Sequence, residues 1–167
     1  VQTSGGAIQE QPFTMASVAI EGSTTPATPM YPRVELPSRT AVAPERPLAL
    51  SGMLTDGGVQ FTINGMWGGG HMHHGMLEQF RQGDPVRFTI RSDVSPEHPF
   101  HLHGQFFQIV ARDGLETSAE PGLRDTVLVQ GRSSVTILTY FENPGRWMYH
   151  CHISEHSELG MMGELEV

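Results

Sequence analysis

The segment HCHISEHSELGMM, residues 150–162, decides how this chain is interpreted, because it holds the only cysteine of the sequence between two histidines. In an extended strand, side chains at positions i and i+2 share one face, and the side chain at i+1 points to the other. His150 and His152 would then point to one side of the strand and Cys151 to the other. One short segment can therefore serve two metal centres, since an electron at the Cys151 sulfur is only a few bonds from either imidazole.

Three further residues complete the first of these centres. His98, from the segment HPFHLHG at 98–104, joins His156 and Met161 downstream of the cysteine in a set of two His, one Cys and one Met. Thiolate and thioether ligands favour Cu(I), imidazole accepts both oxidation states, and a weak axial Met tunes the potential, so this set is typical of a blue-copper electron-transfer site. The alternative for Met161 is an ordinary core residue, as we expect for Met162.

A second group of histidines has the spacing of two His-x-His pairs. His101 and His103 can share one face of a strand, as His150 and His152 can. Four neutral imidazoles converging on one region suit copper, which binds nitrogen ligands more tightly than the other first-row divalent metals do. The alternative is a set of hydrogen-bonded core histidines. The sequence predicts a second copper site here, reached by electrons that pass from Cys151 to His150 or His152.

Most of the chain after residue 47 has the period-two pattern of β-strands. Residues 48–54 and 59–63 flank Asp56-Gly57-Gly58, which is a strong hairpin signal. Short strands separated by Gly and Pro favour an all-β fold, either a Greek-key β-sandwich or a barrel. The further strands are expected at residues 86–90, 105–111, 126–129, 135–141, 146–150 and 164–167.

The first part of the chain has a different composition. Residues 13–21 have the pattern of one strand, and residues 22–46 are rich in proline, which stiffens an extended linker. We expect residues 1–21 to end a preceding domain, residues 22–46 to link the two domains, and residues 47–167 to form the copper domain. The chain has no initiator Met and no visible signal peptide, so we expect it to be processed or to be a piece of a longer protein.

The charge excludes some partners. The formal net charge is −8, and the few Lys and Arg residues are scattered along the chain. Nucleic acid and anionic membranes need a clustered basic surface, so neither is an expected partner. No apolar run approaches the roughly 20 residues needed to span a bilayer.

The two histidine segments, HPFHLHG and HCHISEHSELGMM, resemble the copper motifs in the last cupredoxin domain of multicopper oxidases, such as laccases and bacterial copper-tolerance oxidases. FTING at 61–65, RDTVLV at 124–129 and PGRWMYH at 144–150 also resemble family segments. The resemblance covers roughly residues 47–167 in order. It implies a cupredoxin fold there, with the end of an earlier cupredoxin domain at 1–21.

The same resemblance assigns ligands to three types of copper. It implies that the type 1 copper is held by His98, Cys151, His156 and Met161. It implies His101 as a ligand of the type 2 copper, and it gives the type 3 pair the ligands His103, His150 and His152.

Activity and partners follow from the family as well. Its members oxidise a reducing substrate at the type 1 copper, one electron at a time, and reduce dioxygen to water at a trinuclear copper cluster. The expected partners are therefore dioxygen and a small reductant, which is a phenol, an aromatic amine or a metal ion. The family's cluster also uses two His-x-His motifs from the first domain, which this sequence lacks, so we expect an N-terminal cupredoxin domain to supply them. Most bacterial relatives are periplasmic or secreted, and we expect the same location here.

Two other functions use parts of the same residue set. A small blue-copper electron carrier needs only the type 1 ligands and leaves His101, His103, His150 and His152 unexplained. A nitrite-reductase-like enzyme links type 1 copper to a single type 2 copper and needs only one of the two histidines beside the cysteine.

Three other features of the sequence suggest further roles. The segment HMHHGM at 71–76 follows three glycines and is either a copper-capturing loop or a solvated polar loop. Many family members have an acidic residue directly after the last type 1 histidine, but here Ser157 takes that position and Glu158 follows, so a proton-relay role of Glu158 stays open. The aromatic residues Trp67, Trp147, Phe106 and Phe107 are expected in the core.

Overall fold

A computed structural model of the chain describes residues 2–4, 7–9, 36–38, 41–68, 77–118, 120 and 122–167. The chain divides into two compact units, residues 1–34 and residues 35–167. In the first unit, two short strands, β1 (Gln2–Ser4) and β2 (Ala7–Gln9), pair antiparallel. The strand predicted at 13–21 and the segment HMHHGM at 71–76 lie outside the described residues. The division into an earlier domain, a linker and a copper domain stays a prediction.

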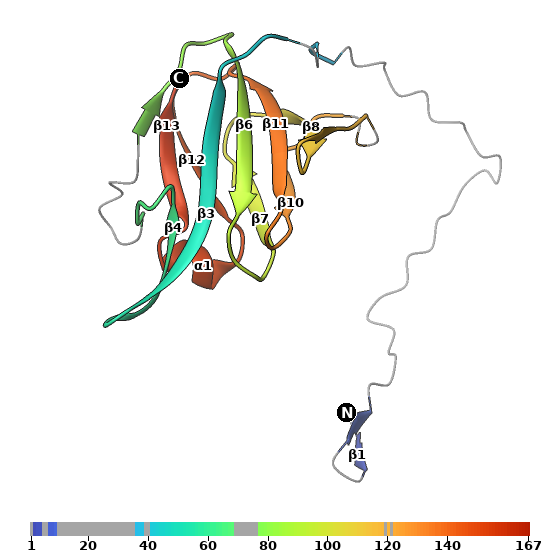
Figure 1. Cartoon of the computed structure of the whole chain (residues 1–167), viewed down its shortest axis with the longest axis vertical. Coiled ribbons are helices and arrows are strands. Elements are labelled where there is room, and N and C mark those ends of the chain that lie inside the picture. Colours follow the sequence, from blue (N-terminus) through green and yellow to red (C-terminus); the bar gives the residue numbers. More distant parts are fainter. Residues whose placement is uncertain are drawn as a thin grey trace, which may run out of the picture. The chain divides into compact units, whose positions relative to one another are not determined.

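The second unit is a sandwich of two β-sheets, which confirms the predicted all-β fold (Figure 1). The first sheet has six strands in the order β4-β3-β6-β11-β8-β9, and the second has five in the order β10-β7-β12-β13-β5. The strands of the first sheet are β3 (Glu45–Thr55), β4 (Gly58–Ile63), β6 (Pro85–Ser92), β8 (Phe107–Arg112), β9 (Leu115–Glu116) and β11 (Ser134–Tyr140). Those of the second are β5 (Leu77–Gln79), β7 (His98–Leu102), β10 (Thr126–Val129), β12 (Arg146–Cys151) and β13 (Met162–Glu166).

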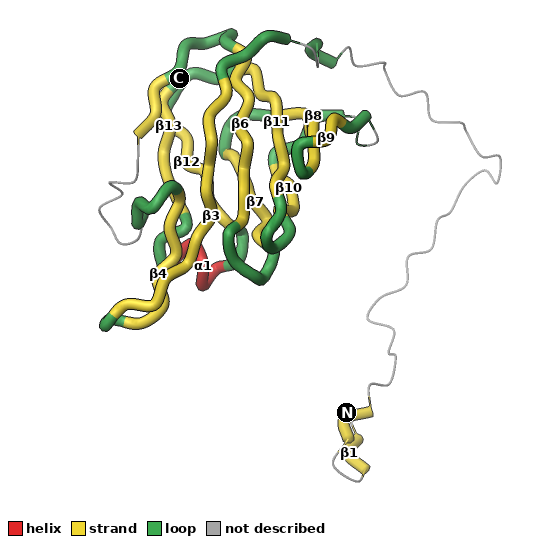
Figure 2. Tube along the Cα trace, in the orientation of Figure 1, coloured by secondary structure: helices red, strands yellow, loops and turns green. Residues whose placement is uncertain are grey.

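The chain crosses repeatedly between the two sheets (Figure 2). β6 lies in the first sheet, β7 in the second, β8 in the first and β10 in the second. This Greek-key type of connection makes β7 and β12 neighbours, although they are far apart in the sequence. The two strands that carry the predicted copper motifs therefore lie side by side.

The core lies between the sheets and follows the alternation of the strands. In β6, Val86, Phe88 and Ile90 are buried, and the residues between them are partly exposed. Removing such apolar side chains from water is the main stabilising term of the fold, about 1.5–3 kcal/mol for each fully buried large side chain. The largest fully buried side chains come from both sheets and include Phe100, Phe107, Phe141, Leu50, Ile109 and Leu165.

Several strand predictions agree closely with the structure. The hairpin predicted at Asp56-Gly57 joins β3 and β4, and the strand predicted at 126–129 coincides with β10. Six described elements were not predicted: the short strands β1, β2, β5 and β9, the strand β7, which contains Pro99, and the helix α1 (Ser154–Glu158). No helix among the described residues is long and apolar enough to cross a membrane.

Two of the four aromatic residues predicted for the core are on the surface instead. Phe107 is fully buried and Trp147 packs against the core, but Trp67 is 48% exposed and Phe106 is 55% exposed. Phe106 immediately precedes the inward-facing Phe107, and neighbouring residues in an extended chain point in opposite directions. Trp67 lies in the connection after β4, where its indole ring rests against the backbone of Gly160.

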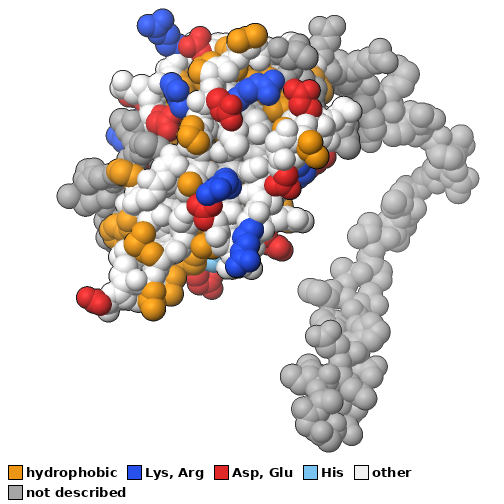
Figure 3. Space-filling view, in the orientation of Figure 1, with side chains coloured by type: hydrophobic (Ala, Val, Ile, Leu, Met, Phe, Trp, Pro, Cys, Tyr) orange, Lys and Arg blue, Asp and Glu red, His pale blue; other side chains and the backbone are white. Residues whose placement is uncertain are grey.

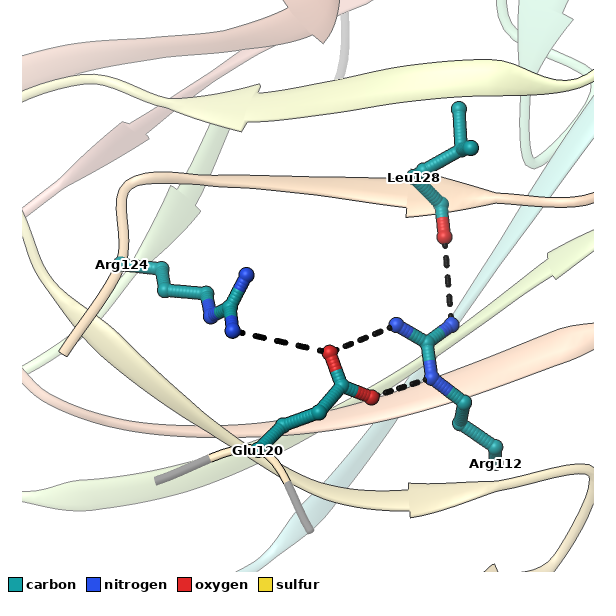
Figure 4. A network of polar contacts seen from close by, with 4 residues as sticks. All are labelled: Arg112, Glu120, Arg124 and Leu128. Carbon is teal, nitrogen blue, oxygen red and sulfur yellow. Dashed lines mark hydrogen bonds and ion pairs between the residues drawn. The ribbon is translucent and has the colours of Figure 1, made fainter. Parts of the chain in front are cut away.

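A polar network ties the connection before β10 to the strands beside it (Figure 4). The Arg112 guanidinium donates two hydrogen bonds to the Glu120 carboxylate, at 2.6 and 3.0 Å, and a third to the Leu128 carbonyl at 3.3 Å. Arg124 lies 3.8 Å from the same carboxylate. The hydrogen bonds from Arg112 hold the pKa of Glu120 below its ordinary value. Bidentate pairing of this kind is stronger than a single exposed ion pair.

We predict that Glu120→Gln lowers the free energy of unfolding by about 0.5–1 kcal/mol at neutral pH, since the pair is partly exposed. A carboxylate with a lowered pKa in the folded state contributes its stability above the ordinary Glu pKa and loses it as the pH falls through the lower, folded-state value. The difference between wild type and variant should therefore disappear in acid. Urea unfolding at several pH values measures it, and a difference that does not shrink as the pH falls would contradict the assignment.

Candidate metal centre

The pairing of β7 with β12 sorts the predicted ligands onto two faces of one sheet. The strands are antiparallel, and the register places His150 opposite His101 and Cys151 opposite Phe100. Cys151 and Phe100 are buried, whereas His150 and His101 are only partly buried. The predicted alternation is therefore confirmed: the cysteine faces the interior, and its histidine neighbour faces the other way.

On the inner face, three donor atoms converge. The Nδ1 atoms of His98 and His156 lie 3.1 Å apart, and the Cys151 Sγ lies 3.7 Å from the first and 3.6 Å from the second. A point equidistant from the three atoms is about 2.0 Å from each, close to the roughly 2.0–2.3 Å of metal bonds to His and Cys. The spacing of these donors therefore fits a single metal ion.

Separate elements bring these donors together. His98 begins β7, Cys151 ends β12, and His156 is the buried residue of α1. We call residues 156–161 the ligand loop, because it runs from His156 to Met161. At its end, the Met161 amide donates to the His156 carbonyl at 2.8 Å, and the Met161 carbonyl accepts from the Cys151 amide at 3.1 Å.

Met161 is fully buried and belongs to the same core cluster as Cys151. The three donors together with Met161 are called the buried site from here on. The set is His, Cys, His and Met, and all four side chains are nearly inaccessible to water.

Burial also sets the protonation of the buried site. Desolvation, with a smaller effect of the neighbouring His156, lowers the pKa of His98 to about 4. Desolvation lowers the pKa of His156 and raises that of the Cys151 thiol. The imidazoles are therefore neutral, which is the form that binds metals, and a bound cation would replace the thiol proton. The Ile153 amide, which donates to the Cys151 Sγ at 3.4 Å, supports the thiolate.

On the other face, four imidazoles form a group that we call the histidine face: His101, His103, His150 and His152. The ring of His101 lies 4.6 Å from that of His103 and 4.7 Å from that of His152, between centroids. The rings of His150 and His152 stack at 5.1 Å. The sequence predicted that these four side chains would gather, and they do.

Backbone carbonyls orient two of these rings. The Nδ1 of His101 lies 2.9 Å from the Asp125 carbonyl, and the Nδ1 of His150 lies 2.8 Å from the Cys151 carbonyl. A carbonyl accepts a hydrogen bond, so Nδ1 carries the proton in both rings and Nε2 keeps its lone pair for a metal. The Nε2 atoms of His103 and His150 face each other at 3.0 Å.

The histidine face is open where the buried site is closed. His152 is exposed and the other three are partly exposed. Among the described residues, only His98, Cys151 and His156 form a group of three or more His, Cys, Asp or Glu ligand atoms within 4.8 Å of one another. The four imidazoles of the histidine face therefore lie close together without bringing three donor atoms as near to one another as those of the buried site.

The comparisons with known proteins agree with this geometry. The family profile described as "Multicopper oxidase" matches residues 44–167. The chain belongs to the multicopper oxidase family. The multicopper oxidase mco of Staphylococcus aureus is 39% identical over 72 residues, which are 42% of this chain and 16% of that protein. The iron transport multicopper oxidase fio1 of Schizosaccharomyces pombe is 38% identical over 94 residues, 50% of this chain and 15% of that protein.

Solved multicopper oxidase structures share the fold. The multicopper oxidase McoA of Aquifex aeolicus superposes with a TM-score of 0.65 at 30% identity, over 79% of this chain and 31% of that one. A laccase from Pediococcus acidilactici gives a TM-score of 0.65 at 29% identity, over 80% of this chain and 29% of that one. The chain thus spans about a sixth of the first curated relatives and about a third of these structures. Within the family, its buried site has the ligand set of a type 1 copper.

The sequence did not identify the groups that orient the histidines. The carbonyls of Asp125 and Cys151 are backbone atoms, so the identity of their residues carries no signal for this role. The Thr126 hydroxyl lies 3.0 Å from the His101 Nδ1. Sequence analysis did not predict this side-chain partner either. Thr126 lies opposite His101 in the pairing of β10 with β7, which only the register reveals.

We predict that His156→Ala abolishes the stabilisation of this chain by Zn²⁺, whereas His152→Ala retains it. Zinc binds tetrahedrally to His and Cys ligands, and a metal at about 100 times its Kd stabilises the folded state by roughly 2.7 kcal/mol. Thermal unfolding with and without Zn²⁺ measures the effect. His152 is the matched control because it is exposed on the opposite face. Equal zinc stabilisation of wild type and His156→Ala would contradict the buried site.

Proposed function

We propose that this chain is the C-terminal copper domain of an oxidase that takes single electrons from a reducing substrate and passes them to dioxygen. In this proposal the buried site binds the type 1 copper. His101 contributes to the type 2 copper, and the type 3 pair receives His103, His150 and His152. Bound copper would supply the one-electron redox chemistry and the reduction of dioxygen to water. Family membership and the two-faced arrangement of ligands support the proposal.

One observation carries it: the residue that joins the two ligand groups is a single cysteine between two outward histidines. From the Cys151 sulfur, the covalent path to the imidazole of His150 or His152 runs through the two side chains and the single peptide unit between them. A second path exists for His150, whose Nδ1 donates to the Cys151 carbonyl at 2.8 Å. A simple electron carrier has no use for either path.

The chain's own residues hold the two sites in different surroundings. The buried site is dry, so its donors are neutral until a cation binds, and low polarity favours the less charged Cu(I) state. The histidine face is partly exposed, which suits completion by histidines of another cupredoxin domain. Residues outside this chain, in the same polypeptide or a second one, would supply them. A periplasmic or secreted location stays a prediction.

The surface near the buried site has features that suit an organic reductant or a metal ion as substrate. Exposed apolar side chains gather at the end of the sandwich that carries the β3–β4 hairpin (Figure 3). They include Met53, Leu54 and Val59 on the hairpin, Trp67 after β4, and Leu159 in the ligand loop. Such a border contributes contact area to a phenol or an aromatic amine, and the exposed carboxylates of Glu97, Glu155 and Glu158 beside the ligands of the buried site offer oxygen atoms to a metal ion.

We predict that Cys151→Ser abolishes the blue absorption band and substrate oxidation in the full-length protein, because a hydroxyl is a hard, weak ligand where copper needs a thiolate. Absorption spectroscopy and oxygen uptake measure the two effects. Substrate oxidation that continues in Cys151→Ser would defeat the proposed electron route.

His150→Ala and His152→Ala should separate the two sites. Each removes a ligand of the histidine face and leaves the inward-facing donors in place, so we expect the blue band to remain while oxygen uptake falls to background. Copper content should fall in both variants, since ligands are lost from the cluster. Full oxygen uptake in both variants would favour the electron-carrier class instead.

A further inference from the structure

The end of β4 and the connection that follows it donate hydrogen bonds to backbone carbonyls of the ligand loop. We call residues 61–68 the β4 turn segment. The Phe61 amide and the Trp67 indole Nε1 both donate to the Leu159 carbonyl, each at 2.9 Å. The Gly68 amide donates to the Gly160 carbonyl, also at 2.9 Å. Three hydrogen bonds thus bind this segment to the stretch of the ligand loop that lies between His156 and Met161.

The contact is too close to admit side chains at two positions. A Cβ on Gly160 would lie 1.9 Å from the Trp67 ring and 2.6 Å from the Phe61 carbonyl oxygen, and the φ of Gly160 is +113°. A Cβ on Gly68 would lie 2.2 Å from the Met162 carbonyl oxygen. The ligand loop and Met162 therefore lie directly against the β4 turn segment, and any larger residue at either glycine would force them apart.

The Phe61 ring covers one of the predicted ligands. Its centroid lies 4.0 Å from that of His156 with an interplanar angle of 32°, and it meets His98 edge-on at 6.5 Å. Gly52, opposite Phe61 in the hairpin, leaves room for the ring, since a Cβ there would lie 3.1 Å from it. With the ring in place, His156 is only 7% exposed.

We propose that Phe61 is a positioning residue of the buried site and that the β4 turn segment holds the ligand loop in its metal-binding conformation. The proposal rests on the proposed function. Phe61 limits rotation of the His156 imidazole, so that Nδ1 stays directed at Cys151 and His98. The ring also excludes water from the imidazole, which favours Cu(I) over the more highly charged Cu(II) state and raises the reduction potential.

The test compares Phe61→Leu with Phe80→Leu in the copper-loaded chain. Phe80 is the matched control because it also stacks on a ring, that of Phe141 at 4.4 Å, and lies outside the buried site. We expect Phe61→Leu to weaken copper binding roughly 10–100-fold, to shift the blue band and to lower the reduction potential. Phe80→Leu should lose stability and keep both the band and the potential. Trp67→Phe, which removes the indole N–H together with part of the ring, should shift the potential in the same direction by less.

A metal-free measurement separates this proposal from the proposed function. In the NMR spectrum of the metal-free chain, the His156 ring signals should move and broaden in Phe61→Leu and stay as in wild type in Phe80→Leu. Unchanged His156 signals, or an unchanged band and potential in the copper form, would overturn the positioning role. A wild-type chain that stays colourless with copper contradicts the proposed function, and the NMR comparison still decides the role of Phe61.

Discussion

The hydrogen-bonded register between β7 and β12 is the constraint on which the rest of the arrangement depends. It sets His150 opposite His101 and Cys151 opposite Phe100, so the sulfur enters the core while the imidazoles leave it. A slip of one residue would exchange the two faces of a strand. The cysteine would then point to the open side, and His150 would be buried without its partners. The apolar neighbours Phe100, Leu102 and Tyr149 oppose such a slip, because they would lose their places in the core.

The two ligand groups differ both in chemistry and in surroundings. The buried site combines two imidazoles with a thiol and a thioether and is closed to water, whereas the histidine face has four imidazoles and lies partly open at the sheet surface. The closed group draws its donors from β7, β12 and α1, which pack within one domain. The open group has its rings oriented by the carbonyls of Asp125 and Cys151, but it is not enclosed. In the proposed function, the closed group is complete within this domain, and the open group needs ligands from a neighbouring one.

The sequence predicted the parts of the molecule that depend on local spacing. The alternation at 150–152, the hairpin at Asp56-Gly57 and the strand β10 all follow from patterns of two to six residues. Features set by tertiary contact were missed. α1 is too short to have a helical period, β7 contains a proline that argues against a strand, and Trp67 was assigned to the core although it lies on the surface. The contacts of Phe61 were also invisible, because they join segments about a hundred residues apart.

The compactness of the stretch from Cys151 to Met161 has a consequence for protein engineering. Three of the four members of the buried site lie within this one contiguous stretch, which crosses α1 and ends at β13. Moving this stretch into another cupredoxin would transfer these three residues together. The graft would carry the donor atoms but not their support, since the scaffold must already provide a histidine at the start of its β7 counterpart. It must also provide an aromatic ring and a glycine-lined surface where Phe61, Trp67 and Gly68 lie here.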